Sequence, residues 1–117
     1  MSCSPNILPM STKTKLEFNS TYFKSIFGDD EDEWQTFVSI NISTYRKGVA
    51  DFRSAIQEKD MSTVKEVRHA LGPTLQQWGA TSLEQRLIGL EPETLDSEWP
   101  LLEPEFEDLI AALEALK

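Results

Sequence analysis

The sequence predicts an all-α fold, namely an antiparallel up-down four-helix bundle with a short N-terminal capping element. Several long stretches carry apolar residues at alternating spacings of three and four, which is the period of a helix that buries one face. Strand signals are weak, because β-branched residues are sparse, no stretch alternates apolar and polar residues for long, and no Asn-Gly hairpin dipeptide occurs. We therefore expect helices that pack against one another around a shared core.

The N-terminal part divides into a lead-in and a short aromatic element. Residues 1–15 are rich in Ser, Pro, Thr and Lys, so we expect a flexible segment that precedes a single domain at residues 16–117. Residues 18–27 form either a short helix or an irregular segment that packs onto the domain, and Gly28 ends it. The apolar residues of this element are Phe18, Tyr22, Phe23, Ile26 and Phe27.

A long helix is predicted over residues 30–59. Its apolar residues have the heptad-like spacing of a helix in a bundle. They are Trp34, Val38, Ile42, Tyr45, Val49, Phe52 and Ile56. The acidic run at residues 29–33 lacks the spacing and the glycine of a calcium loop, so we interpret it as charge that favours a helix N-terminus. Gly48, near the middle, is a candidate position for a bend.

The next helix is predicted to begin after Asp60, a suitable N-cap, and to end at Gly79, since glycine is favoured just past a C-terminus. Its apolar face is formed by Val64, Val67, Leu71, Leu75 and Trp78. With a rotation of roughly 100° per residue, His69 points roughly 180° from the centre of that face. The sequence therefore places its single histidine on the water-facing side of a helix.

A third helix is predicted to open at one of two capping boxes and to stop at Pro92. The boxes pair Thr81 with Glu84 and Ser82 with Gln85, and the buried stripe is Leu83, Leu87 and Leu90.

Residues 91–100 are predicted to form a loop. The last helix begins near Pro104, which suits a first turn, or begins earlier, near Trp99, and bends. Its apolar face is formed by Phe106, Leu109, Ile110, Leu113 and Leu116.

The composition argues against several kinds of partner and site. The net charge of −9, from 20 acidic and 11 basic residues, disfavours nucleic acid and anionic membranes, because both attract a basic surface. The single cysteine, Cys3, allows no internal disulfide, which indicates a reducing cytoplasm. The first residues lack a secretion signal, and no apolar run approaches the roughly 20 residues of a membrane helix. One histidine and one distant cysteine are too few preferred ligands for a zinc site.

The residues around His69 follow a specific order. A leucine stands two positions after the histidine, Gly72-Pro73 follow it, and Gly79-Ala80 close the helix. This order resembles the histidine-containing phosphotransfer (HPt) domains of two-component phosphorelays, in which a His is followed by Leu-Lys-Gly and later by Gly-Ala or Gly-Leu. The spacing between the histidine and the closing pair is the same here. The resemblance covers residues 19–117, including the long helix before the histidine and both helices after it.

The resemblance implies a phosphorelay intermediate. His69 would accept a phosphoryl group from the phospho-aspartate of a response-regulator receiver domain and pass it to another receiver, and a hybrid sensor histidine kinase is a further expected partner. The chain would be a monomeric, cytoplasmic carrier with no kinase activity and no cofactor of its own, and it has no glycine-rich phosphate loop. The receiver would supply Mg²⁺, and transfer would depend on positioning and charge neutralisation.

Two positions depart from the family pattern. The family lysine three residues after the histidine is Gly72 here, and the glycine after it is Pro73. Lys65, one turn before the histidine on the same face, could supply a substitute charge. Arg68 points partly sideways, and Gln76, two turns on, could donate to phosphoryl oxygens. We expect Gly72 to face water and to let a partner approach closely, while Pro73 bends the helix and fixes the histidine.

The missing lysine leaves two other functions open. A degenerate HPt-like adaptor would bind a receiver domain without carrying phosphate. An unrelated helical interaction module would have its exposed histidine by coincidence.

Overall fold

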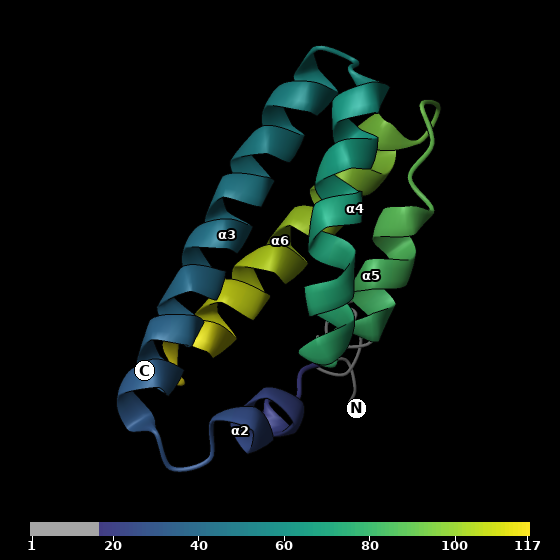
Figure 1. Cartoon of the computed structure of the whole chain (residues 1–117). Helices are drawn as coiled ribbons and strands as arrows, with labels where there is room; N and C mark the ends of the chain where they lie inside the picture. The colour runs from purple at the N-terminus through teal and green to yellow at the C-terminus, as the bar shows by residue number, and fades with distance from the viewer. Residues whose placement is uncertain (1–16) are drawn as a thin grey trace, which may run out of the picture.

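The computed structural model describes residues 17–117, and over this range the protein is all-helical, with five α-helices and no strand (Figure 1). The helices are α2 at Thr21–Phe27, α3 at Glu31–Gln57, α4 at Met61–Gln77, α5 at Thr81–Ile88 and α6 at Leu95–Glu114. The all-α prediction is confirmed. The predicted flexible segment at residues 1–15, which includes Cys3, lies outside the described residues. None of these helices is both long and apolar enough to cross a membrane.

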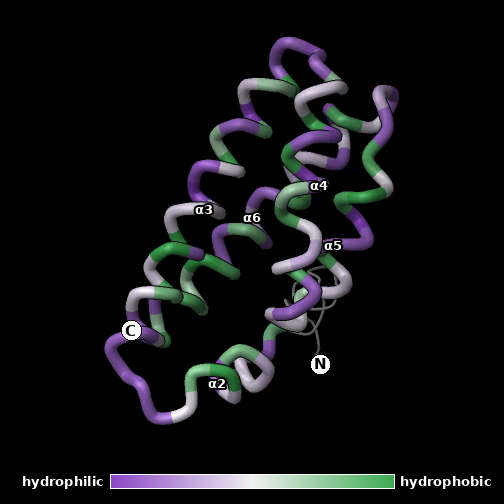
Figure 2. Tube along the Cα trace, in the orientation of Figure 1, coloured by the Kyte–Doolittle hydropathy of each residue, from purple (hydrophilic) through white to green (hydrophobic). Residues whose placement is uncertain are grey.

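The longest helix, α3, runs along one side of the molecule, with α4 and α6 beside it (Figure 1). It packs against α4 and against α6, while α5 packs against α4 and α6 and the short α2 contacts α3. One hydrophobic core lies among them, and it contains every stripe residue predicted for residues 30–59. Figure 2 shows hydrophobic and hydrophilic positions alternating along α3, as expected for a helix that buries one face.

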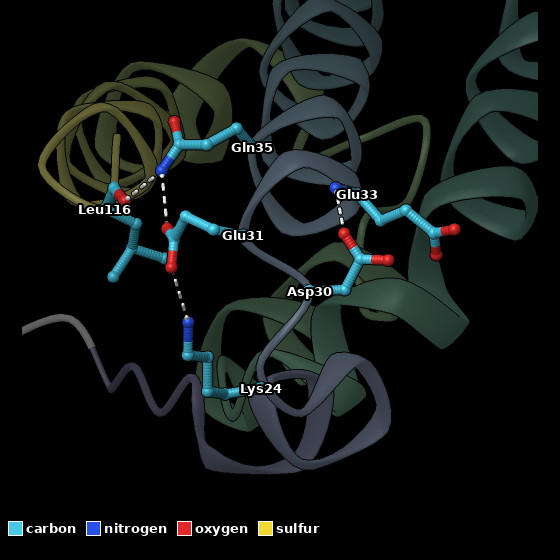
Figure 3. A network of polar contacts seen from close by, with 6 residues as sticks. All are labelled: Lys24, Asp30, Glu31, Glu33, Gln35 and Leu116. Carbon is cyan, nitrogen blue, oxygen red and sulfur yellow. Dashed lines mark hydrogen bonds and ion pairs between the residues drawn. The ribbon is translucent and has the colours of Figure 1, made fainter.

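The start of α3 is capped by Asp30. The side-chain carboxylate of Asp30 accepts a hydrogen bond from the backbone N–H of Glu33 at 3.1 Å (Figure 3). Glu31, Asp32 and Glu33 lie in the first turn, where negative side chains interact favourably with the helix dipole. The acidic run therefore has the position predicted for it.

A polar network joins this end of α3 to its neighbours (Figure 3). Glu31 forms an ion pair with Lys24 of α2 at 3.6 Å and accepts a hydrogen bond from the Gln35 side-chain amide at 3.2 Å. The same amide donates to the carbonyl of Leu116, just after α6, at 3.3 Å. These contacts bring α2, α3 and the end of α6 together.

Gly48 has a packing role at the contact between α3 and α4. A Cβ atom at this position would lie 2.8 Å from Cδ1 of Leu71, which is closer than real Cβ contacts. The absent side chain therefore allows Leu71 to pack against the backbone of α3, so packing, rather than the predicted bend, is the role that the structure gives this glycine.

The turn after α4 is a Schellman motif. Gly79 has a positive φ of 79°, which glycine adopts without strain. Its N–H donates to the carbonyl of Gln76 at 2.9 Å, and the N–H of Ala80 donates to the carbonyl of Leu75 at 2.8 Å. The predicted C-terminal role of Gly79 is confirmed.

The turn before α4 has the same form with a less suitable residue. Lys59 has a φ of 56°, and the N–H of Asp60 donates to the carbonyl of Ala55 at 2.8 Å. Asp60 then caps α4, because its carboxylate accepts from the N–H of Thr63 at 3.1 Å and from the Thr63 hydroxyl at 2.6 Å. These hydrogen bonds lower the pKa of Asp60, and its predicted role as N-cap is confirmed.

The start of α5 differs from the prediction, because neither capping box forms. The N-cap is the buried Ala80, which offers no side-chain acceptor. The backbone N–H of Ser82 instead donates to the carboxylate of Glu17, while Glu84 is bonded to the side chain of Gln76 in α4. One acceptor from outside the helix, the carboxylate of Glu17, thus bonds an N–H of the first turn in place of the expected box. The predicted stripe of Leu83, Leu87 and Leu90 is buried.

The start of α6 is earlier than predicted, so the loop prediction for residues 91–100 is wrong from residue 95 onward. Leu95, Trp99 and Leu102 are buried at spacings of four and three, which extends the apolar face of the helix upstream. Pro104 is therefore not in a first turn. Pro100 and Pro104 lie inside the helix at exposed positions, where water can satisfy the carbonyls that proline leaves without a donor.

Candidate functional site

His69 lies in the middle of α4, and its side chain is exposed. The opposite face of α4 is in the core, where Val64, Leu71 and Leu75 are buried. The structure therefore places the imidazole on the water-facing side, as the helical rotation predicts.

The helix that carries His69 is fixed from the side of α3. The Thr74 hydroxyl donates to the carbonyl of Leu71 at 3.0 Å, so the buried hydroxyl of Tyr45 in α3 donates to the Thr74 oxygen at 2.7 Å. Burial raises the pKa of Tyr45 well above its ordinary value, so this hydroxyl stays protonated and able to donate even at alkaline pH. The Trp78 indole N–H donates to the Asn41 side chain at 3.1 Å. Such contacts limit the movement of the helix beneath the histidine.

A groove of about 510 Å³ lies along the exposed side of α4, between α4 and α5. Its lining includes all the site residues that the sequence predicts and two residues of α5 that it does not. The full lining is Lys65, Arg68, His69, Gly72, Pro73, Gln76, Glu84 and Ile88.

The side chain of Arg68 forms hydrogen bonds with the backbone near the end of α5. Its guanidinium donates to the carbonyl of Leu90 at 2.9 Å and to the carbonyl of Leu87 at 3.3 Å. These carbonyls lie at the C-terminal end of α5, where a helix lacks donors for its last turn and where positive charge is favourable. Arg68 therefore acts as a cap for α5.

The side chain of Glu84 forms hydrogen bonds with Gln76 and lies beside Gly72. The Gln76 side-chain amide donates to the two carboxylate oxygens of Glu84 at 3.1 and 3.2 Å. Gly72 is buried, and a Cβ atom there would meet Glu84 Oε2 at 3.6 Å. The prediction that Gly72 faces water is therefore wrong. Helical rotation gives the direction of a residue, but the packing of α5 onto α4 decides whether that direction is open.

Lys65 is the remaining cationic side chain of the groove. It is exposed and lies one helical turn before His69. Within residues 17–117 its ammonium group makes no hydrogen bond or ion pair with another side chain, so it can reach a ligand at His69.

Pro73 is exposed and lies one turn after the histidine. Because proline has no N–H, it cannot donate to the carbonyl of His69 in the regular helical pattern. The carbonyl of His69 therefore lacks its regular helical donor.

Glu84 and Ile88 are the groove residues that the sequence does not predict. The sequence assigns Glu84 to a capping box, and its spacing of four from Ile88 is the available signal that both side chains share a face of α5. Glu84 is 6% exposed, whereas Ile88 is 52% exposed. The groove thus has a nearly buried carboxylate inside and an apolar residue at its edge.

Comparisons of the chain with protein-family models, with curated proteins and with solved structures found no significant match.

Proposed function

We propose that this chain is an HPt-type phosphorelay carrier, folded as an antiparallel up-down four-helix bundle, with His69 as the phosphoryl acceptor. The observation that supports this function best is the exposed imidazole at the centre of a helix that is capped at both ends. A docking protein can reach such a ring without moving the fold. A cytoplasmic location and partnership with receiver domains, including those of hybrid sensor histidine kinases, belong to the same proposal.

The proposed reaction needs no ATP site on this chain. A ring nitrogen of neutral His69 attacks the phosphorus of a receiver phospho-aspartate, the N–P bond forms, and the P–O bond breaks to release the carboxylate. Transfer to a second receiver reverses these changes. Mg²⁺ would belong to the receiver, so the residues of this chain supply orientation and charge.

Lys65 and Pro73 have supporting roles in this proposal. The ammonium group of Lys65 is free to approach the phosphoryl oxygens and to offset part of their charge. The Pro73 ring fixes the backbone one turn after the histidine.

Glu84 favours a second candidate function. Its carboxylate lies beside the position that holds lysine in the family, and negative charge there opposes a phosphoryl group. The alternative is therefore an HPt-like adaptor that binds receivers without carrying phosphate.

An assay of phosphoryl transfer from isolated receiver domains distinguishes the carrier from the adaptor. The protein is incubated with phosphorylated receiver domains and Mg²⁺, and acid-labile, base-stable label is measured on the wild type, on His69→Gln and on the control variant Ala70→Gln, which changes the neighbouring exposed position. We expect label on the wild type and on Ala70→Gln, and none on His69→Gln. Label that persists in His69→Gln rejects His69 as acceptor. Receiver binding without label supports the adaptor, and absence of both supports an unrelated helical interaction module.

A further inference from the structure

The His69 groove contains charges of both signs, and they lie on different sides of the histidine along α4. Lys65 is one turn before His69 and is exposed, while Arg68 is directed to the carbonyls at the end of α5. Glu84 lies in the other direction, where its carboxylate is bonded to Gln76 and faces Gly72. The groove is therefore positive toward the start of α4 and negative toward its end.

The Glu84 carboxylate is close enough to act on a group bound to the histidine. Side chains three residues apart on a helix have Cβ atoms about 5–6 Å apart. The Glu84 Oε2 atom lies 3.6 Å from the position of a Cβ at Gly72, which is three residues after His69. Because Glu84 is 6% exposed, water and salt screen its charge less than that of a surface carboxylate.

This inference rests on the proposed function. We infer that the negative charge of Glu84 opposes the binding of a phosphoryl group to His69, while the positive charge of Lys65 favours it. The phosphoryl oxygens are drawn toward Lys65 and repelled from Glu84, so the pair sets both the orientation of the group and how readily it is taken up. A carrier with this arrangement loads less readily than one with lysine at position 72, and it gives up its phosphoryl group more readily.

Chemical phosphorylation by phosphoramidate tests this inference without any receiver. A ring nitrogen of His69 attacks the phosphorus, the N–P bond of the reagent breaks, and ammonia leaves. Initial rates are measured for the wild type, Glu84→Gln, Lys65→Gln and the control Glu66→Gln. Glu66 is an exposed carboxylate one turn before His69, so its removal changes the net charge equally but outside the groove.

We expect Glu84→Gln to label roughly threefold to tenfold faster than the wild type, because removal of a poorly screened charge raises the rate at which an anion arrives. Lys65→Gln should label roughly twofold to fivefold more slowly, and Glu66→Gln should stay within roughly twofold of the wild type because its charge is well screened. Glutamine at position 84 retains an oxygen that can accept from Gln76, so the groove keeps its shape.

A neutral reagent distinguishes an effect of the Glu84 charge on the labelling rate from an effect on access to His69. Diethylpyrocarbonate carries no charge, so its rate with His69, measured at pH 8, should be equal in the wild type and Glu84→Gln. Equal phosphoramidate rates for those two proteins, or equal gains for Glu84→Gln and Glu66→Gln, overturn the inference. So does a gain with both reagents, since that shows a change in access. None of these results depends on receivers, so failure of transfer from receivers counts against the proposed function alone.

Discussion

The two faces of α4 are built in different ways. The face toward α3 is apolar and closely packed, with Leu71 against the backbone of Gly48 and a buried hydrogen bond between Tyr45 and Thr74. The face toward α5 is a groove whose contacts are polar, including those between Gln76 and Glu84. The first face holds the helix in place, and the second leaves the imidazole of His69 exposed. A closely packed support and a solvent-accessible imidazole are thus separated on a single helix.

The largest effect is expected on the face toward α3. Leu71→Ala should lower the free energy of unfolding by about 2–5 kcal/mol, because it leaves a cavity where the leucine packs on Gly48. Urea denaturation followed by circular dichroism measures the change. Gly48→Ala added to Leu71→Ala should recover part of the loss, since the new methyl group then enters the space that the leucine has left. An additive or larger loss in the double variant would show that the two positions do not share this contact.

A smaller effect is expected from the cations of the groove face. Arg68→Ala should lower the free energy of unfolding by about 1–2 kcal/mol, because the carbonyls of Leu87 and Leu90 lose a charged donor. Lys65→Ala should change it by less than about 0.5 kcal/mol, since Lys65 is exposed and makes no hydrogen bond or ion pair with another side chain among residues 17–117. In the receiver assay we expect the order to reverse, with transfer slower in Lys65→Ala than in Arg68→Ala. If both variants have wild-type transfer rates, Lys65 does not replace the family lysine.

The two buried glycines give a direct comparison of the faces. At Gly72 a Cβ would meet Glu84 at an ordinary contact distance of 3.6 Å, whereas at Gly48 it would be only 2.8 Å from Leu71. Helix propensity favours alanine over glycine at both positions, but the ring of Pro73 disfavours the helical conformation of a preceding residue that carries a Cβ, so Gly72→Ala should change the free energy of unfolding by less than about 1 kcal/mol. Gly48→Ala must displace Leu71, so it should be less favourable for stability than Gly72→Ala. Thermal unfolding of the two variants compares them, and a greater gain at Gly48 would contradict the difference in packing.

The periodic parts of the fold are predictable from the sequence because burial of a helix face leaves a direct pattern. The stripe of α3, the N-cap Asp60 and the closing Gly79 all follow from local rules and are observed. The start of α6 is not predicted, because two prolines suggest a boundary while the burial of Leu95 and Trp99 extends the helix past it. Tertiary packing overrides the local signal there.

The candidate site is predictable on α4 and not on α5. The direction of His69 and the residues beside it follow from rotation about one helix. The covering of Gly72 and the position of Glu84 depend on how α5 lies on α4, which no spacing within either helix determines. The same limit explains why Gln76, placed correctly in the groove, has a partner that the sequence does not reveal.

The smallest effect is a pH dependence at the turn where α3 and α4 meet. Hydrogen bonds from Thr63 lower the pKa of Asp60 in the folded protein, so this carboxylate stabilises the fold fully above its unfolded pKa of about 3.9. The contribution is lost as the pH falls from that value through the lower folded pKa, because the folded state then takes up the proton as well. Asn also caps helices but does not titrate, so the stability difference between the wild type and Asp60→Asn should shrink below about pH 4. Urea denaturation of both proteins between pH 3 and pH 7 measures this difference, and a constant value would mean that the cap does not depend on the charge of Asp60.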